Sequence, residues 1–152
     1  MTSTYQKTTS YRTDRPVPAH PIHAILSAYP LALFTAALVA DIAYANSANM
    51  QWADFAVWLI AGGCAMGVLA ALAGIVDALV VRRRHRTRTV AGITHGLGTL
   101  LMLALGIVNA FVHSRDAWTS VVPTGLALSI VVSILAVVTS WLGYTLQARE
   151  AR

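Results

Sequence analysis

The sequence predicts an all-α protein, a bundle of four transmembrane helices that run up, down, up and down with both termini in the cytoplasm. Apolar residues are gathered in four long blocks instead of alternating with polar residues. Only 11% of the residues are charged, whereas a soluble domain has about 25%. The arginines collect at the ends of the blocks, and this distribution is typical of membrane proteins.

The predicted membrane domain covers residues 19–148 and follows a tail at residues 1–18. The tail is rich in Thr, Ser, Tyr and Pro, so we expect it to be disordered in the cytoplasm. A span needs about 20 mostly apolar residues. The stretches that satisfy this are residues 21–44, 53–81, 90–113 and 121–146. Because two of the three connections between them are short, consecutive helices should pack antiparallel.

The orientation follows from the positions of lysine and arginine. Three precede the first span, five lie between the second and third, and two follow the fourth, whereas the other two loops contain only Arg115. The positive-inside rule therefore places the termini and the five-arginine loop in the cytoplasm. The net charge of +5 is then expected to meet anionic lipid, and we expect no nucleic-acid partner.

Each span carries small or polar residues at alternating steps of three and four, the spacing of one helix face. Lipid does not favour exposed polar groups, and small residues let helices approach closely, so these faces should point at one another. The positions are His23, Ser27, Pro30, Phe34, Ala37 and Asp41, then Gly63, Gly67, Ala70, Gly74 and Asp77, then His95, Thr99, Met102, Gly106, Asn109 and His113, and finally Ser129, Ser133, Ala136, Ser140 and Gly143.

Ionisable side chains within these spans form an inner layer near the predicted cytoplasmic face. Its members are His20, His23, Asp77 and His95. At 1.5 Å per residue, Asp77 and His95 lie at nearly the same depth. Because charged groups inside a membrane are costly and usually mark a functional site, we predict that three spans converge on a cluster of imidazoles and a carboxylate.

An outer layer contains Asp41, Asn109 and His113. Asp41 lies near the end of the first span, and His113 is followed by Ser114 and Arg115, where we expect water to reach it. Structural or interfacial roles are therefore predicted for this layer.

The inner layer has the residue types of a haem site. Two histidines from different helices at one depth can be the axial ligands of a b-type haem. His23 and His95 are the expected iron ligands, with His20 and Asp77 beside them. The residues expected to make room for the flat macrocycle are Gly74, Gly92, Gly96 and Gly98.

Two other interpretations of the inner layer remain open. Two or three histidines with Asp77 also match the ligand set of a zinc, copper or iron ion. Without any cofactor, His20 and His23 would instead face the cytoplasmic interface, and Asp77 would pair with His95 or with an arginine.

Several motifs resemble a known family in their order along the chain. They are HPIH at 20–23, YPLALFTAAL at 29–38 with Asp41 after it, AGIVD at 73–77, Ala91 before His95, and WLG at 141–143. Together they resemble the bacterial four-span membrane proteins of domain of unknown function 2231, over about residues 19–146. The resemblance implies a multi-pass protein of the bacterial inner membrane in a redox setting, with suspected haem binding. Its motif positions include His20, His23, Asp41, Asp77 and His95.

The leading functional hypothesis is a small b-type haem-binding electron-transfer subunit, or the membrane anchor of a redox complex. It would move electrons between a redox protein partner and the quinone pool, as part of a homo- or hetero-oligomer. We expect no independent catalytic activity, because the chain lacks a phosphate loop, a Gly-x-Ser-x-Gly motif and a zinc-protease helix. The alternatives are a cofactor-free structural or assembly subunit and a protein that binds a metal ion.

Overall fold

The computed structural model describes residues 21–84, 90–115 and 117–150. The predicted tail, His20 and most of the arginine loop lie outside these ranges. The described chain forms α1 (Pro21–Ser47), α2 (Met50–Arg84), α3 (Val90–His113), the short 3-10 helix η1 (Ala117–Ser120) and α4 (Thr124–Glu150). Each long helix is long and apolar enough to cross a membrane, so the predicted four-span helical fold is confirmed.

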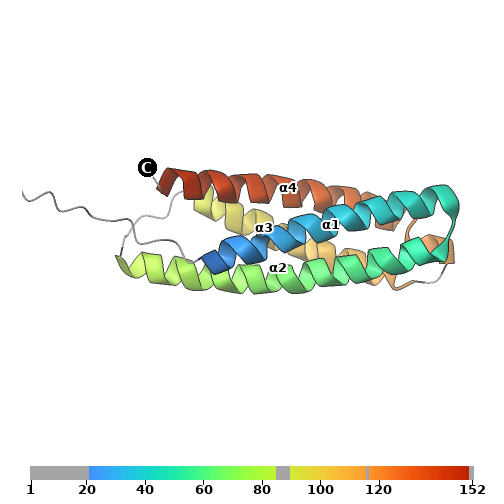
Figure 1. Ribbon diagram of the computed structural model, residues 1–152, viewed down its shortest axis with the longest axis horizontal. Coiled ribbons are helices and arrows are strands. Elements are labelled where there is room, and N and C mark those ends of the chain that lie inside the picture. Colours follow the sequence, from blue (N-terminus) through green and yellow to red (C-terminus); the bar gives the residue numbers. More distant parts are fainter. Residues whose placement is uncertain (1–20, 85–89, 116, 151–152) are drawn as a thin grey trace, which may run out of the picture.

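The four helices lie side by side, and the chain reverses direction at each connection (Figure 1). In the first hairpin, Gly63 of α2 faces Phe34 of α1, and Gly74 faces His23. α2 also packs on α3, and α4 packs on α1. The order around the bundle is therefore α1, α2, α3, α4, with α1 diagonally opposite α3.

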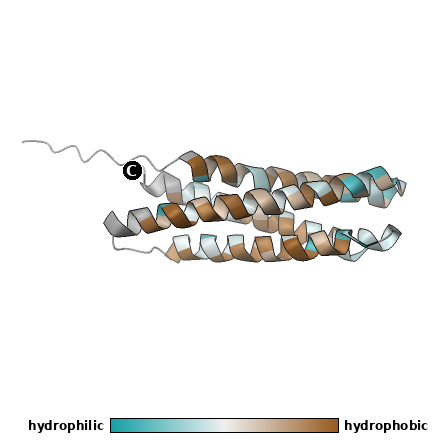
Figure 2. Ribbon diagram, turned by 90° about the horizontal axis from the view of Figure 1, so that it is seen from below, coloured by the Kyte–Doolittle hydropathy of each residue, from teal (hydrophilic) through white to brown (hydrophobic). Residues whose placement is uncertain are grey.

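The outer surface of the bundle suits a bilayer. Apolar residues dominate the middle of the helices in Figure 2, and large side chains such as Trp58, Phe111 and Trp141 are more than two-thirds exposed. In water such a surface would be unfavourable, whereas lipid tails cover it without cost. The chain is thus a multi-pass membrane protein that contacts the lipid bilayer.

α3 covers the same residues as the third predicted span, and the other helices differ from the predicted spans by about a turn at some ends. The first two helices continue almost to each other because the turn between them is very short. Ala48 closes α1 with a positive φ of 52°, a conformation common just after a helix end. The Asn49 side chain accepts a hydrogen bond from the backbone N–H of Gln51 at 3.0 Å, which caps α2.

The fourth helix begins three residues later than predicted. The backbone N–H groups of Val121 and Val122 both bond to the carbonyl of Trp118, which extends the turn of η1. α4 starts at Thr124, directly after Pro123, and the carbonyl of Pro123 accepts a hydrogen bond from the backbone N–H of Ala127.

The two hairpins, α1–α2 and α3–α4, repeat one pattern of burial. Five of the six buried positions described for α1 have buried counterparts in α3 at an offset of 72 residues, and five of the six described for α2 have buried counterparts in α4 at an offset of 69. The α1 and α3 pairs are Pro30 and Met102, Phe34 and Gly106, Ala37 and Asn109, Ala40 and Val112, and Asp41 and His113. The α2 and α4 pairs include Ile60 and Ser129, Gly63 and Val132, Gly67 and Ala136, and Ala70 and Thr139. The hairpins are therefore related by an approximate twofold axis along the bundle, and equivalent residues of α1 and α3 meet on that axis.

We expect Gly63→Ala to lower the thermal stability of the bundle. A Cβ atom at this position would lie 2.8 Å from the buried ring of Phe34, and overpacking of this kind costs about 1–3 kcal/mol. Gly96→Ala is the matched control, since its Cβ would meet nothing within 4 Å and alanine favours a helix by up to about 1 kcal/mol. Thermal unfolding in detergent, followed by circular dichroism, compares the two variants. Equal or higher stability of Gly63→Ala relative to Gly96→Ala would contradict the packing described.

Candidate functional site

Two histidines face each other across the bundle axis at the end where α1 and α3 begin. His23 is in the first turn of α1, and His95 is in the second turn of α3. Their ring centroids are 6.1 Å apart, and the ring planes are nearly perpendicular, at 86°. The two positions are 72 residues apart and hence equivalent in the repeat, so the predicted meeting of these two imidazoles occurs.

Each of these imidazoles is bonded to a backbone carbonyl of the neighbouring helix. Nδ1 of His23 lies 2.9 Å from the carbonyl oxygen of Ala70, and Nδ1 of His95 lies 2.9 Å from that of Thr139. A carbonyl oxygen can only accept, so Nδ1 must carry the hydrogen in both rings. In the neutral form, both rings therefore keep the lone pair of Nε2 available for a ligand.

Two glycines make room for these rings. A Cβ atom on Gly74 would lie 2.9 Å from Cε1 of His23, and one on Gly143 would lie 3.1 Å from Cε1 of His95. Each glycine follows the residue that supplies the carbonyl by four positions, so ring and glycine meet at one turn of the helix. α2 and α4 thus accommodate the two imidazoles in equivalent ways.

Of the four glycines predicted to clear space for a macrocycle, Gly74 and Gly98 have neighbouring side chains in that space. The space at Gly74 is taken by the ring of His23, and a Cβ on Gly98 would lie 2.7 Å from the Thr139 methyl. Gly92 and Gly96 are exposed. Gly74 thus contacts an imidazole, Gly98 brings α3 close to α4, and Gly92 and Gly96 face outward.

The side chains around the histidine pair are less buried than those in the middle of the bundle. No described side chain at this end is buried beyond Pro30 in α1, Ala70 in α2, Met102 in α3 or Thr139 in α4. The fully buried core therefore begins about two and a half turns into α1 and about three turns into α3, and the histidine rings lie outside it.

Asp77 makes no hydrogen bond or ion pair with any residue that the structure describes. Its predicted pairing with His95 is therefore not formed. His20 lies outside the described residues. Within the described ranges, no group of three or more His, Cys, Asp or Glu side chains could hold a metal ion. Of the four residues predicted for the inner layer, the structure brings together His23 and His95.

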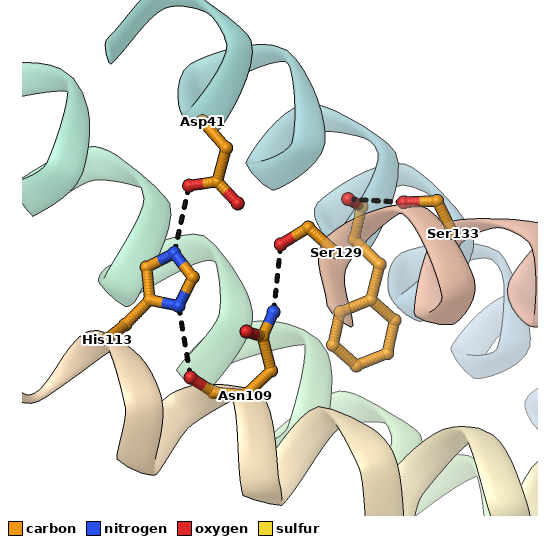
Figure 3. Close-up of polar contacts among 6 residues, drawn as sticks. Asp41, Asn109, His113, Ser129 and Ser133 are labelled. Atoms are coloured by element: carbon orange, nitrogen blue, oxygen red, sulfur yellow. Dashed lines mark hydrogen bonds and ion pairs between the residues drawn. The ribbon is translucent and has the colours of Figure 1, made fainter. Parts of the chain in front are cut away.

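A second polar site lies at the opposite end of the axis and is far more buried (Figure 3). Asp41, Asn109 and Ser129 are almost inaccessible, and His113 is 7% exposed. Nε2 of His113 lies 2.9 Å from Oδ1 of Asp41, and its Nδ1 lies 3.0 Å from the backbone carbonyl of Asn109. The Asn109 side-chain amide donates to Oγ of Ser129 at 2.8 Å. α1, α3 and α4 are thereby joined by one network.

The expectation that water reaches His113 is therefore wrong. α4 covers the imidazole because its second residue is Gly125, where a Cβ would lie 2.8 Å from Cε1 of His113. The three described histidines thus share one arrangement, an imidazole packed against a glycine of a neighbouring helix. His113 differs from the other two because both of its ring nitrogens have partners.

Two oxygens of this network have no hydrogen-bond partner within the described structure. They are Oδ2 of Asp41 and Oδ1 of Asn109, and both are fully buried. An unpaired buried polar atom costs about 1–3 kcal/mol, so these two acceptors mark a place where a small donor would be stabilised.

Sequence reasoning grouped Asp41, Asn109 and His113 correctly but missed their burial and the contribution of Ser129 and Gly125. One signal could have found the site. The interval of 18 residues from His23 to Asp41 recurs from His95 to His113, and it indicates two equivalent helices whose polar ends meet in pairs.

We expect Asp41→Ala to destabilise the bundle by about 3–5 kcal/mol, because it leaves His113 buried without the partner of Nε2. Asp54→Ala, at an exposed position of α2, is the control and should change stability by less than about 0.5 kcal/mol. Unfolding by increasing SDS fraction in mixed micelles provides the measurement. If Asp41→Ala is as stable as Asp54→Ala, the buried pair contributes nothing to the fold.

Comparisons with known proteins agree with the four-helix architecture. A family model described as "Predicted membrane protein (DUF2231)" matches residues 19–151. No curated protein and no solved structure matches the chain. Because the family model covers nearly the whole of the described bundle, the chain belongs to the DUF2231 family of predicted membrane proteins.

Proposed function

We propose that this protein is a b-type haem-binding electron-transfer subunit, or the haem-carrying membrane anchor of a redox complex, with His23 and His95 as the axial ligands. The observation that carries the proposal is the pair of imidazoles on the bundle axis, each with Nδ1 bonded to a backbone carbonyl. Such a hydrogen bond fixes the tautomer and the orientation of a metal-ligating histidine.

The spacing of the rings supports a shared metal. Metal–nitrogen bonds of about 2 Å put the centres of two imidazoles on opposite sides of one metal about 6 Å apart. The ring centroids of His23 and His95 are 6.1 Å apart. The ring spacing therefore matches that of two imidazoles bound to one metal.

The number of ligands favours haem over a bare metal ion. A zinc ion usually takes three or four protein ligands, whereas a haem iron needs only axial ones because the macrocycle supplies the rest. The described residues offer two imidazoles and no group of three metal-binding side chains.

A bound haem would supply one-electron transfer, with a potential tuned by its ligands and their hydrogen bonds. The chain's own contribution is to hold both rings by the carbonyls of Ala70 and Thr139 and to enclose the site in apolar helices. The partners proposed for such a subunit are a redox protein and the quinone pool.

A second candidate is a cofactor-free structural subunit. The observation in its favour is that Gly74 and Gly143 already accommodate the rings of His23 and His95, and each ring has a hydrogen-bond acceptor. In this case the histidines would fasten α1 to α2 and α3 to α4.

The two candidates predict different absorption spectra. Protein purified after expression with ample haem is expected to show a Soret band of six-coordinate haem. His23→Ala and His95→Ala should each abolish it or convert it to a five-coordinate spectrum, because one axial ligand is lost. Asp77→Asn is the control and should keep the spectrum, since it leaves both imidazoles in place.

A colourless wild-type protein would overturn the haem proposal, and so would a spectrum unchanged in both histidine variants. Elemental analysis of the same samples separates the remaining cases. Stoichiometric zinc or copper would indicate a metal-ion site, and neither metal nor haem would favour the structural subunit.

We also propose that the protein lies in the bacterial inner membrane with the histidine pair near the cytoplasmic face, because ten of its eleven Lys and Arg residues flank that end of the spans. Green fluorescent protein fused to the C-terminus should then fluoresce, and alkaline phosphatase fused there should be inactive, because its disulfides form only in the periplasm. The same reporters fused after Arg115 should give the opposite result. Active phosphatase at the C-terminus would reverse the assigned orientation.

A further inference from the structure

We infer that Asp41 and His113, together with Asn109 and Ser129, form a binding site for one exchangeable proton and one small hydrogen-bond donor, a water molecule. This site is distinct from the pair of His23 and His95 and does not depend on any cofactor. It rests on burial, on the number of hydrogens that the contacts require, and on the two oxygens that lack donors.

The site is separated from the histidine pair by a closed apolar layer. Asp41 follows His23 by 18 residues in the same helix, which corresponds to about 27 Å along the axis. Between these levels the core cluster packs on the axis, and its members include Phe34, Met102, Leu103 and Val132. The proton must therefore exchange with the solvent at the end of the bundle where Asp41 and His113 lie.

The contacts of His113 fix how many hydrogens the pair holds. Nδ1 faces the carbonyl of Asn109, which can only accept, so Nδ1 carries a hydrogen. The 2.9 Å contact between Nε2 and Oδ1 of Asp41 then contains one more hydrogen, because otherwise two acceptors would face each other. That hydrogen is either on the carboxyl group or on the imidazole, and in both cases the pair is neutral overall.

Loss of the shared proton would leave a carboxylate, a neutral imidazole and a net charge of −1 among apolar helices. The reverse step restores neutrality, as a hydronium ion delivers its proton to the carboxylate and leaves as water. A buried charge without compensation is unfavourable in this environment. The pair is therefore the carrier of the proton.

The ligand chemistry follows from the two unpaired acceptors. Oδ2 of Asp41 and Oδ1 of Asn109 are buried and lack donors, and both belong to the network of side chains that surround His113 in Figure 3. A water molecule has two hydrogens to donate and typically makes about three bonds when buried. A monovalent cation would satisfy the same oxygens, and the experiment below distinguishes the two.

A proton at this site has a short path to the solvent, and among the described residues no other buried acidic or basic side chain lies beside it. His113 is the last residue of α3, and Ser114 and Arg115 after it are exposed. Tyr44 of α1 directs its hydroxyl to the sulfur of Met50, and Asp54 of α2 is exposed. At this level, the buried side chains described for α2, α4 and η1 are apolar or carry a hydroxyl group.

The test is a pH titration of the ring nitrogens of His113 by ¹⁵N NMR in lipid nanodiscs, from about pH 5 to about pH 9, a range that brackets ordinary histidine titration. The spectrum of His113→Gln assigns the signals. We expect release of one proton, seen as a shift of the Nε2 signal if the imidazole holds it and as a shift of the ¹³C signal of the Asp41 carboxyl if the carboxyl group holds it, while Nδ1 stays protonated. Asp41→Asn should abolish this transition, and Asp54→Asn should leave it intact.

Constant signals of the His113 ring nitrogens and of the Asp41 carboxyl carbon in the wild-type protein over the whole range would overturn the proposal and indicate a permanent structural pair. This outcome is measured on the wild-type protein alone. The proposal can therefore be overturned even if Asp41→Asn does not fold. Repeating the titration in sodium chloride and in choline chloride at equal ionic strength tests the ligand. The same midpoint in both salts supports water as the donor, and a midpoint that moves with sodium would overturn it in favour of a cation.

Discussion

The packing of Phe34 on the bundle axis is the contact on which the rest of the structure depends. Its ring lies against the backbone of Gly63 in α2 and of Gly106 in α3, where added Cβ atoms would come within 2.8 and 3.0 Å. Its carbonyl accepts a hydrogen bond from Ser133 of α4 at 3.0 Å. One residue of α1 thus touches all three other helices. In lipid, where the hydrophobic effect does not drive helices together, such close packing and interhelical hydrogen bonds hold a bundle.

This central layer also explains why the polar side chains divide into two groups. An aromatic ring that fills the axis leaves no path for a continuous polar channel, so polar groups can meet only above and below it. The two groups differ in burial because α4 covers His113 at Gly125, whereas the side chains around His23 and His95 are only partly buried.

The repeat of the two hairpins brings equivalent positions of α1 and α3 together, with a different result at each end of the bundle. At one end the paired positions carry the same residue type, His23 and His95, and α2 and α4 accommodate them in equivalent ways. At the other end the pair is unlike, Asp41 and His113, and the two groups share one proton. An approximate axis along the membrane normal, as in other membrane proteins built from repeats, thereby produces a symmetric site and an asymmetric one in the same bundle.

The sequence by itself determined the four spans, the helix faces that meet and the pairing of His23 with His95, because length, composition and helical periodicity are local properties of the chain. Only the tertiary structure decided that His113 is buried, that Ala70 and Thr139 hold the histidine rings, and that glycines seat them. Backbone carbonyls occur at every residue, so their use leaves no trace in the sequence. The burial of a side chain at the end of a helix likewise depends on how the next helix returns, and Gly125 has that effect only once α4 packs against α3.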